Sequence, residues 1–151
     1  MTVSDAAFFV KQGLAHQHLG QLEQARQCYG QALQRDGKNF DALYLMGTTL
    51  AQQGQPEQAL GWLEQAAQVQ ADHAILQNNL GNILLALGRL EQAVAAFDRA
   101  VALKPDYAAA FHRRGVAREG LGRLEEALND HARALALLPT LEPAAQAHAA
   151  L

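Results

Sequence analysis

The segment LGRLEQA, residues 87–93, decides the fold, because close copies of it return at a constant spacing along the chain. The copies begin at residues 19, 53 and 121, so that successive copies lie 34 residues apart. Glycine and alanine keep this spacing outside the segment, at Gly13, Gly47, Gly81 and Gly115 and at Ala32, Ala66, Ala100 and Ala134. A fixed period of this size is typical of repeat architectures. The chain therefore divides into four repeats, residues 6–39, 40–73, 74–107 and 108–141.

Each repeat has the pattern of two amphipathic helices joined by a short turn. In the third repeat, apolar residues recur at helical spacing on both sides of Gly88, at Leu80, Leu84, Leu87, Leu90, Val94 and Phe97. Glycine can close the first helix in the left-handed conformation, and Pro105 ends the second helix because proline cannot continue it. Half of the residues are hydrophobic and only four are prolines, which favours an all-α protein.

Small residues at fixed places indicate how the two helices of a repeat pack. Gly81, Ala93 and Ala100 lack bulk, so that the backbones of two antiparallel helices can approach closely beside them. We expect each glycine of the 34-residue series to lie within a first helix, at its contact with the second.

This pattern resembles the tetratricopeptide repeat, whose signature places Leu-Gly, Ala, Phe, Ala and Pro at set positions within 34 residues. The resemblance covers residues 6–141. The sequence departs from the family pattern at three positions: the Trp position holds Phe9, Leu43, Gln77 and Phe111, the Tyr position holds His16, Leu50, Leu84 and Arg118, and Gly37 and Ala71 stand where Pro is usual. The resemblance implies an α-α superhelix, or solenoid, of four 34-residue helix-turn-helix repeats whose first helices line a concave groove. Residues 1–151 then form a single array, in which residues 142–151 begin a partial C-terminal helix that caps the last repeat.

Charge and composition disfavour several kinds of partner. The net charge of the chain is −3, and the four repeats carry +2, −4, 0 and +1, with Asp5 and Glu142 outside them. This small charge predicts neither a nucleic-acid surface nor an anionic-membrane surface. The N-terminal segment does not have the pattern of a signal peptide, and no apolar run reaches the roughly 18 residues of a membrane span. A single cysteine, Cys28, permits no disulfide within the chain. We expect a cytoplasmic protein that binds protein or peptide.

The sequence does not predict catalysis. Its six histidines lack paired ligand spacing, and it contains neither a nucleophile elbow nor a phosphate-binding glycine loop. We therefore expect no catalytic residue, no metal and no cofactor.

Seven residues are the candidates for the groove. The second, fifth and ninth positions of a first helix share one stripe, and the sixth position lies beside it. The candidates on this stripe are Tyr44, Thr48, Asn78, Asn79, Asn82, His112 and Arg113. The asparagines are the sharpest signal, because an amide can bond a peptide backbone of any sequence and asparagine is a mediocre helix former.

Two groups of related proteins suggest how such residues act. In the O-linked N-acetylglucosamine transferase family, similar asparagines hold an extended peptide, and Asn79 and Asn82 match them here. Co-chaperones with these repeats grip acidic tails through a two-carboxylate clamp, of which Asn79 and Arg113 match, whereas Tyr44, Thr48 and Ala109 do not. The resemblance thus implies a peptide groove and disfavours recognition of a free acidic C-terminus.

Three functions remain open at this point. The first is a non-catalytic scaffold that binds an extended peptide or a partner helix in the groove. The second is the substrate-docking region of a larger enzyme, such as a glycosyltransferase or sulfotransferase, with its catalytic part beyond Leu151. The third is self-assembly through the C-terminal face.

A charged pair is expected in the last repeat. Arg114 stands where the middle repeats have Met46 and Leu80, at a position that should face the second helix. Antiparallel pairing about the turn could bring Asp130 within its reach, and many repeats of this family carry a similar Arg-Gly and Asp. We expect Arg114 and Asp130 to pair for a structural reason, and Asp98 to be an ordinary surface residue.

Overall fold

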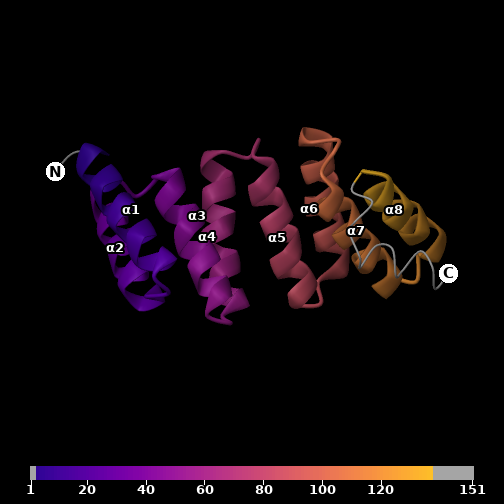
Figure 1. The fold of residues 1–151 in the computed structure, drawn as a ribbon, viewed down its shortest axis with the longest axis horizontal. Coiled ribbons are helices and arrows are strands. Elements are labelled where there is room, and N and C mark those ends of the chain that lie inside the picture. The colour runs from indigo at the N-terminus through magenta and orange to yellow at the C-terminus, as the bar shows by residue number, and fades with distance from the viewer. Residues whose placement is uncertain (1–2, 138–151) are drawn as a thin grey trace. The chain divides into compact units, whose positions relative to one another are not determined.

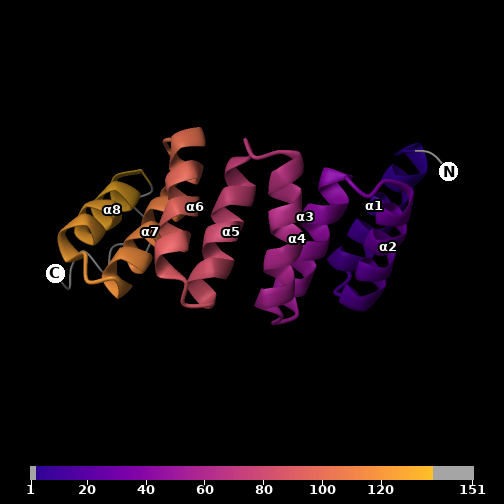
Figure 2. The same cartoon turned by 180° about the vertical axis from the view of Figure 1, so that it is seen from behind.

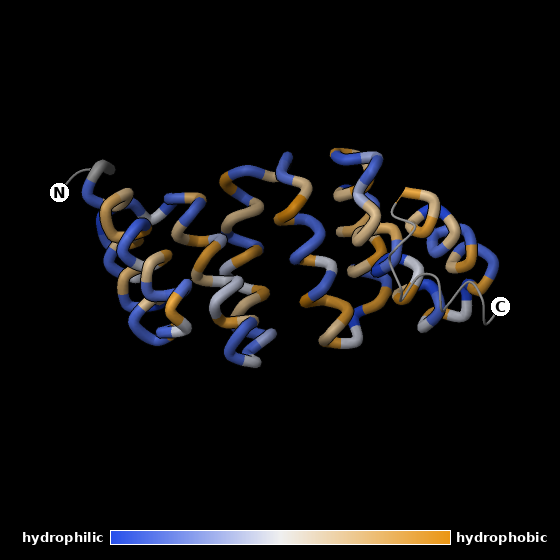
Figure 3. The backbone as a smooth tube through the Cα atoms, in the orientation of Figure 1, coloured by the Kyte–Doolittle hydropathy of each residue, from blue (hydrophilic) through white to orange (hydrophobic). Residues whose placement is uncertain are grey.

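The computed structural model describes residues 3–137, and within this range every regular element is an α-helix, as the repeat pattern predicts. The helices are α1 (Val3–His18), α2 (Leu22–Arg35), α3 (Phe40–Gln52), α4 (Pro56–Val69), α5 (Ala74–Ala86), α6 (Leu90–Leu103), α7 (Ala108–Gly120) and α8 (Leu124–Leu137) (Figure 1). Each helix presents hydrophobic and hydrophilic residues in turn along its length (Figure 3). The all-α, helix-turn-helix solenoid class is therefore confirmed. None of the described helices combines the length and the apolar character that a membrane span needs.

The helices pack in consecutive pairs. The contacts join α1 with α2, α3 with α4, α5 with α6 and α7 with α8, and both views show these pairs side by side (Figures 1 and 2). The pairs belong to two compact units, residues 1–71 and residues 72–151, which we call unit 1 and unit 2. Within unit 1, α2 also packs on α3, and within unit 2, α6 and α5 both pack on α7. The single array over residues 1–151 stays a prediction, and its C-terminal segment, residues 142–151, lies outside the described residues.

The turn inside each pair explains the recurring LGRLEQA segment. Gly88 has φ of 74°, and its counterparts Gly20, Gly54 and Gly122 have similar positive values. The Gly88 N–H donates to the Leu85 carbonyl at 3.0 Å and the Arg89 N–H to the Leu84 carbonyl at 2.9 Å, which closes α5 in a Schellman motif. The left-handed conformation is costly for residues with a Cβ, so glycine is favoured at this position.

The first residues of the helices are stabilised by proline and by side-chain caps, which the sequence predicts only in part. Pro56 opens α4 at a position where its missing N–H breaks no helical bond. Asn39 caps α3 by accepting the Ala42 N–H at 2.9 Å, and His73 Nδ1 caps α5 by accepting the Leu76 N–H at 3.0 Å. The histidine cap was not expected, because histidine is not among the common cap residues.

The glycines of the 34-residue series lie within first helices at the contact with the second, as predicted. A Cβ on Gly81 would lie 2.5 Å from Phe97 Cε1, and a Cβ on Gly115 would lie 2.8 Å from His131 Cε1. The four side chains that fill these places, each sixteen residues after its glycine, are all buried: Tyr29, Leu63, Phe97 and His131. This contact fixes the spacing of the two helices in every pair.

Candidate functional site

The asparagines of α5 place buried acceptors on a first helix of unit 2. Asn78 and Asn82 lie one turn apart; Asn78 is 7% exposed, and Asn82 is half-buried. The Oδ1 atoms of both are buried, and neither accepts a hydrogen bond from any residue in the described range, 3–137. A buried acceptor without a donor costs about 1 to 3 kcal/mol. Asn79, the third predicted asparagine, is half-buried beside them.

The neighbouring first helix, α7, supplies the other two candidates of unit 2. The helices α5 and α7 contact each other, and the candidates stand at corresponding positions of the two helices. Arg113 is exposed on α7, so its guanidinium is available to an anionic group. His112 is half-buried, and its Nδ1 lies 3.2 Å from Nδ1 of His131 on α8.

His112 ends a series of hydrogen bonds that runs through the fully buried His131. His131 is fully buried, and its other nitrogen, Nε2, is bonded to Glu119 Oε1. Burial lowers the pKa of His112 below its usual 6.5; His131 and Arg113 lower it further, while Glu119 acts in the opposite direction. One feature of the sequence indicates this series of hydrogen bonds: His131 stands where the other repeats have Tyr29, Leu63 and Phe97.

The Arg114–Asp130 pair is confirmed, and it is larger than predicted. Arg114 donates from Nε and Nη2 to the two oxygens of Asp130, at 3.0 and 2.8 Å, and Arg118 Nη1 donates to the same carboxylate at 2.7 Å. Burial lowers the pKa of Arg114, but its hydrogen bonds and charge interactions with Asp130 and Asp98 outweigh burial, so the pKa is raised. Asp98 lies on the helix surface, as expected, but it is not independent of the pair, since Asp98 Oδ1 accepts a bond from Arg114 Nη1 at 2.8 Å. The Arg114 side chain is long enough to reach carboxylates on both α6 and α8.

Tyr44 and Thr48 belong to unit 1, on α3. The Tyr44 ring stacks on Phe40, with the ring centroids 6.0 Å apart. The Thr48 hydroxyl donates to the Leu45 carbonyl at 3.1 Å, which occupies its one proton. The two side chains are half-buried, and their place in a groove stays a prediction.

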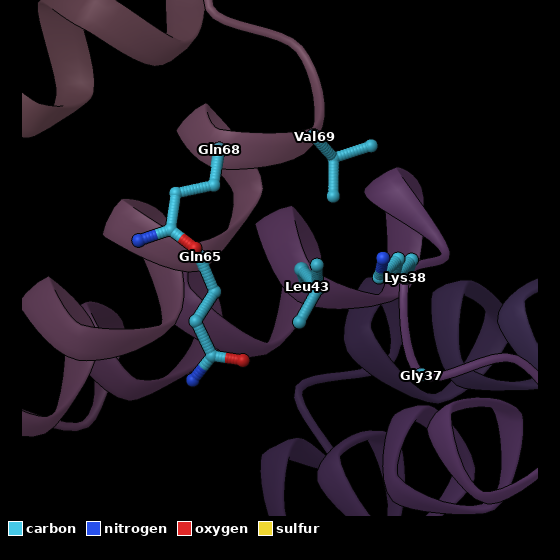
Figure 4. A pocket seen from close by; sticks show the side chains of 6 residues that line it. All are labelled: Gly37, Lys38, Leu43, Gln65, Gln68 and Val69. Carbon is cyan, nitrogen blue, oxygen red and sulfur yellow. The ribbon is translucent and has the colours of Figure 1, made fainter.

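A hollow of about 560 Å³ opens in unit 1 (Figure 4). It lies between the turn that joins α2 to α3 and the last turns of α4. Its lining consists of Gly37, Lys38, Leu43, Gln65, Gln68 and Val69. None of the seven candidates lines it. Across residues 3–137, no three side chains of histidine, cysteine, aspartate or glutamate are grouped so that they could hold a metal ion.

The comparisons with known proteins agree with this architecture. The tetratricopeptide repeat family model matches residues 10–74, 44–108 and 78–149, so the chain belongs to the tetratricopeptide repeat family. A search of curated proteins gives no significant match.

Solved structures share the fold. One is YrrB, described as a TPR protein with an unusual peptide-binding site, with 26% identity and a TM-score of 0.87 over 95% of this chain and 74% of that chain. Another is the first TPR of Spaghetti (RPAP3) bound to the HSP90 peptide SRMEEVD, with 28% identity and a TM-score of 0.72 over 76% of this chain and 91% of that chain. A third is MamA from Desulfovibrio magneticus RS-1, with 22% identity and a TM-score of 0.85 over 89% of this chain and 76% of that chain.

Proposed function

We propose that this chain is a non-catalytic scaffold that holds an extended peptide segment of a partner protein on the α5–α7 face of unit 2. Asn78, Asn79 and Asn82 supply amides from α5, and His112 and Arg113 supply an imidazole and a cation from α7. Together these groups can bond a peptide backbone and pair with one acidic group.

The observation that carries this proposal is the pair of buried oxygens without donors, Oδ1 of Asn78 and of Asn82. An extended peptide carries N–H groups that can donate to these oxygens. Each oxygen reaches a peptide N–H group when its amide turns about the χ2 angle toward the ligand. The binding of a peptide would then remove the cost of burying two unpaired acceptors. A purely structural role does not account for them, because apolar side chains would fill the same space without that cost.

Two of the similar structures support a peptide as the ligand. The RPAP3 repeat is bound to SRMEEVD, and YrrB is described by its peptide-binding site. Of the clamp that grips acidic tails in co-chaperones, this chain matches only Asn79 and Arg113. We therefore propose an internal extended segment with one acidic group near Arg113, in place of a free C-terminus held by two clamped carboxylates.

To test this proposal, a binding peptide is first selected from a random library of short peptides with the wild-type protein as the target. Its affinity for the wild type and for variants is then measured by titration calorimetry. Asn78→Leu combined with Asn82→Ala is expected to weaken binding about 5-fold to 150-fold, since each lost bond costs about 0.5 to 1.5 kcal/mol. The same variant should unfold at an unchanged or higher temperature, because it removes two unpaired buried oxygens.

Gln92→Ala is the matched control, since Gln92 carries an exposed amide on the second helix α6. It should leave both the affinity and the melting temperature unchanged. If the asparagine variant binds the selected peptide as tightly as the wild type, the proposed site is wrong.

A further inference from the structure

We infer that Ile75 determines the specificity of the proposed peptide site, by binding a large apolar side chain of the segment that Asn78 and Asn82 hold. The inference rests on the proposed function, because it assigns a further contact on the same helix. It defines the ligand as an extended segment with one large apolar side chain, in addition to the acidic group near Arg113.

The first observation is the exposure of Ile75. Ile75 is the second residue of α5 and is 50% exposed, whereas every other leucine and isoleucine of α5 is buried or half-buried. It is therefore the large apolar residue that this helix offers to a ligand. A single exposed isoleucine is common on protein surfaces, so the inference also depends on where Ile75 lies.

Ile75 lies on the stripe of α5 that carries the three asparagines. Residues three, four and seven apart share one face of an α-helix, and Asn78, Asn79 and Asn82 follow Ile75 at these intervals. The Cβ atoms of residues three or four apart are about 5 to 6 Å from each other, so Ile75 is a direct neighbour of Asn78 and Asn79. The buried oxygens without donors, Oδ1 of Asn78 and of Asn82, therefore lie on the same stripe as the exposed isoleucine.

The dimensions of an extended segment allow it to contact all three residues. Asn78 and Asn82 are four residues apart, which is about 6 Å along the helix axis. The N–H groups of alternate residues in an extended segment point the same way and are about 6.6 Å apart, so two of them can donate to the two oxygens. Ile75 lies about 4.5 Å beyond Asn78 along the axis, within reach of a side chain one or two residues further along the segment.

The chemistry of Ile75 then selects the side chain. Binding removes water from Ile75 and from the ligand residue opposite it. An apolar residue gains free energy from this burial, whereas a polar residue loses its hydration and receives no hydrogen bond from Ile75. Ala109, the corresponding residue of α7, is exposed and also lacks a polar group. We therefore expect leucine, isoleucine, methionine or phenylalanine at this place in the ligand.

The contact is tested with the peptide selected on the wild-type protein. Each residue of this peptide is replaced by alanine in turn, and titration calorimetry gives the affinities for the wild type and for Ile75→Gln. Loss of one large apolar side chain should weaken binding to the wild type about 5-fold to 30-fold, since its burial against Ile75 is lost. The same loss should change binding to Ile75→Gln by less than about 2-fold, because the two effects are coupled.

Leu124→Gln is the matched control, since Leu124 is the first residue of α8 and is 57% exposed. It should leave the effect of every alanine replacement as in the wild type. Ile75→Leu keeps an apolar side chain and should keep the coupling to the apolar residue of the peptide. The melting temperatures of the three variants should stay near that of the wild type, because each substitution changes an exposed side chain.

A second selection tests the specificity itself. The same library selected on Ile75→Lys should yield peptides with an acidic residue where the wild type selects the large apolar one, because the lysine attracts a carboxylate. An apolar residue selected equally by both proteins overturns the inference.

The outcomes separate this inference from the proposed function. Binding that depends on Asn78 and Asn82 but shows no apolar residue coupled to Ile75 overturns the inference and leaves the proposed function standing. A loss of affinity in Leu124→Gln equal to that in Ile75→Gln also overturns the inference. Binding that does not depend on Asn78 and Asn82 overturns the proposed function, and the role of Ile75 with it.

Discussion

Asp130 is a buried carboxylate that two arginines of the last repeat share. Its side chain is 4% exposed and accepts bonds from Arg114 and Arg118, which are themselves mostly buried. Removing one member of a buried ionic cluster leaves the other charges without compensation, which costs more than an exposed pair contributes.

We predict that Asp130→Ala lowers the free energy of unfolding by about 2 to 4 kcal/mol, somewhat less than for a fully buried pair because Arg114 keeps its bond to Asp98. Urea denaturation measures the change. Glu23→Ala is the control, since it breaks the exposed pair between Glu23 and Arg26 and should cost less than about 1 kcal/mol. Equal effects of the two substitutions would contradict the structural role of Asp130.

At the scale of the helices, the contact between a first-helix glycine and the side chain sixteen residues later holds each pair together. A Cβ at position 81 would overlap the ring of Phe97, which is fully buried. Gly61 offers the opposite case, because it lies within α4 and a Cβ there would meet nothing within 4 Å.

Gly81→Ala is therefore expected to destabilise the fold by about 1 to 3 kcal/mol through overpacking. Gly61→Ala should stabilise it by about 0.5 to 1 kcal/mol, because alanine loses less backbone freedom than glycine when a helix forms. The melting temperatures of the two variants should move in opposite directions. A stabilised Gly81→Ala protein would mean that the helices of this pair do not approach as closely as described.

At the scale of the whole molecule, stability should depend on pH through His112. Its pKa in the folded chain is lowered, chiefly by burial, so the unfolded chain binds this proton more readily than the folded one. The free energy of unfolding that His112 contributes is present above pH 6.5 and is lost as the pH falls through the folded pKa.

His112→Asn tests this, because Asn78 occupies the same position in repeat three. Denaturation above and below pH 6.5 should show that acid destabilises the wild type more than it destabilises the variant. An identical loss in the two proteins would show that other groups cause the acid sensitivity.

The sequence by itself determined the architecture, because all four repeats carry the same local pattern. The 34-residue period, the turn glycine at Gly88, the apolar spacing on either side of it and the small Gly81 all specify a helix pair through contacts close in the chain. Even the pairing of Arg114 with Asp130 followed from register, since antiparallel helices about a short turn bring such positions together.

Only the tertiary structure decided which polar side chains have hydrogen-bond partners, because the periodicity of the sequence does not determine which side chains of separate helices meet. It gave Arg114 a second partner in Asp98, and it linked His112 to Glu119 through His131. It also left the buried oxygens of Asn78 and Asn82 without donors. Spacing fixes which face of a helix a side chain is on, whereas burial and hydrogen bonding depend on the side chains that neighbouring helices bring to that face.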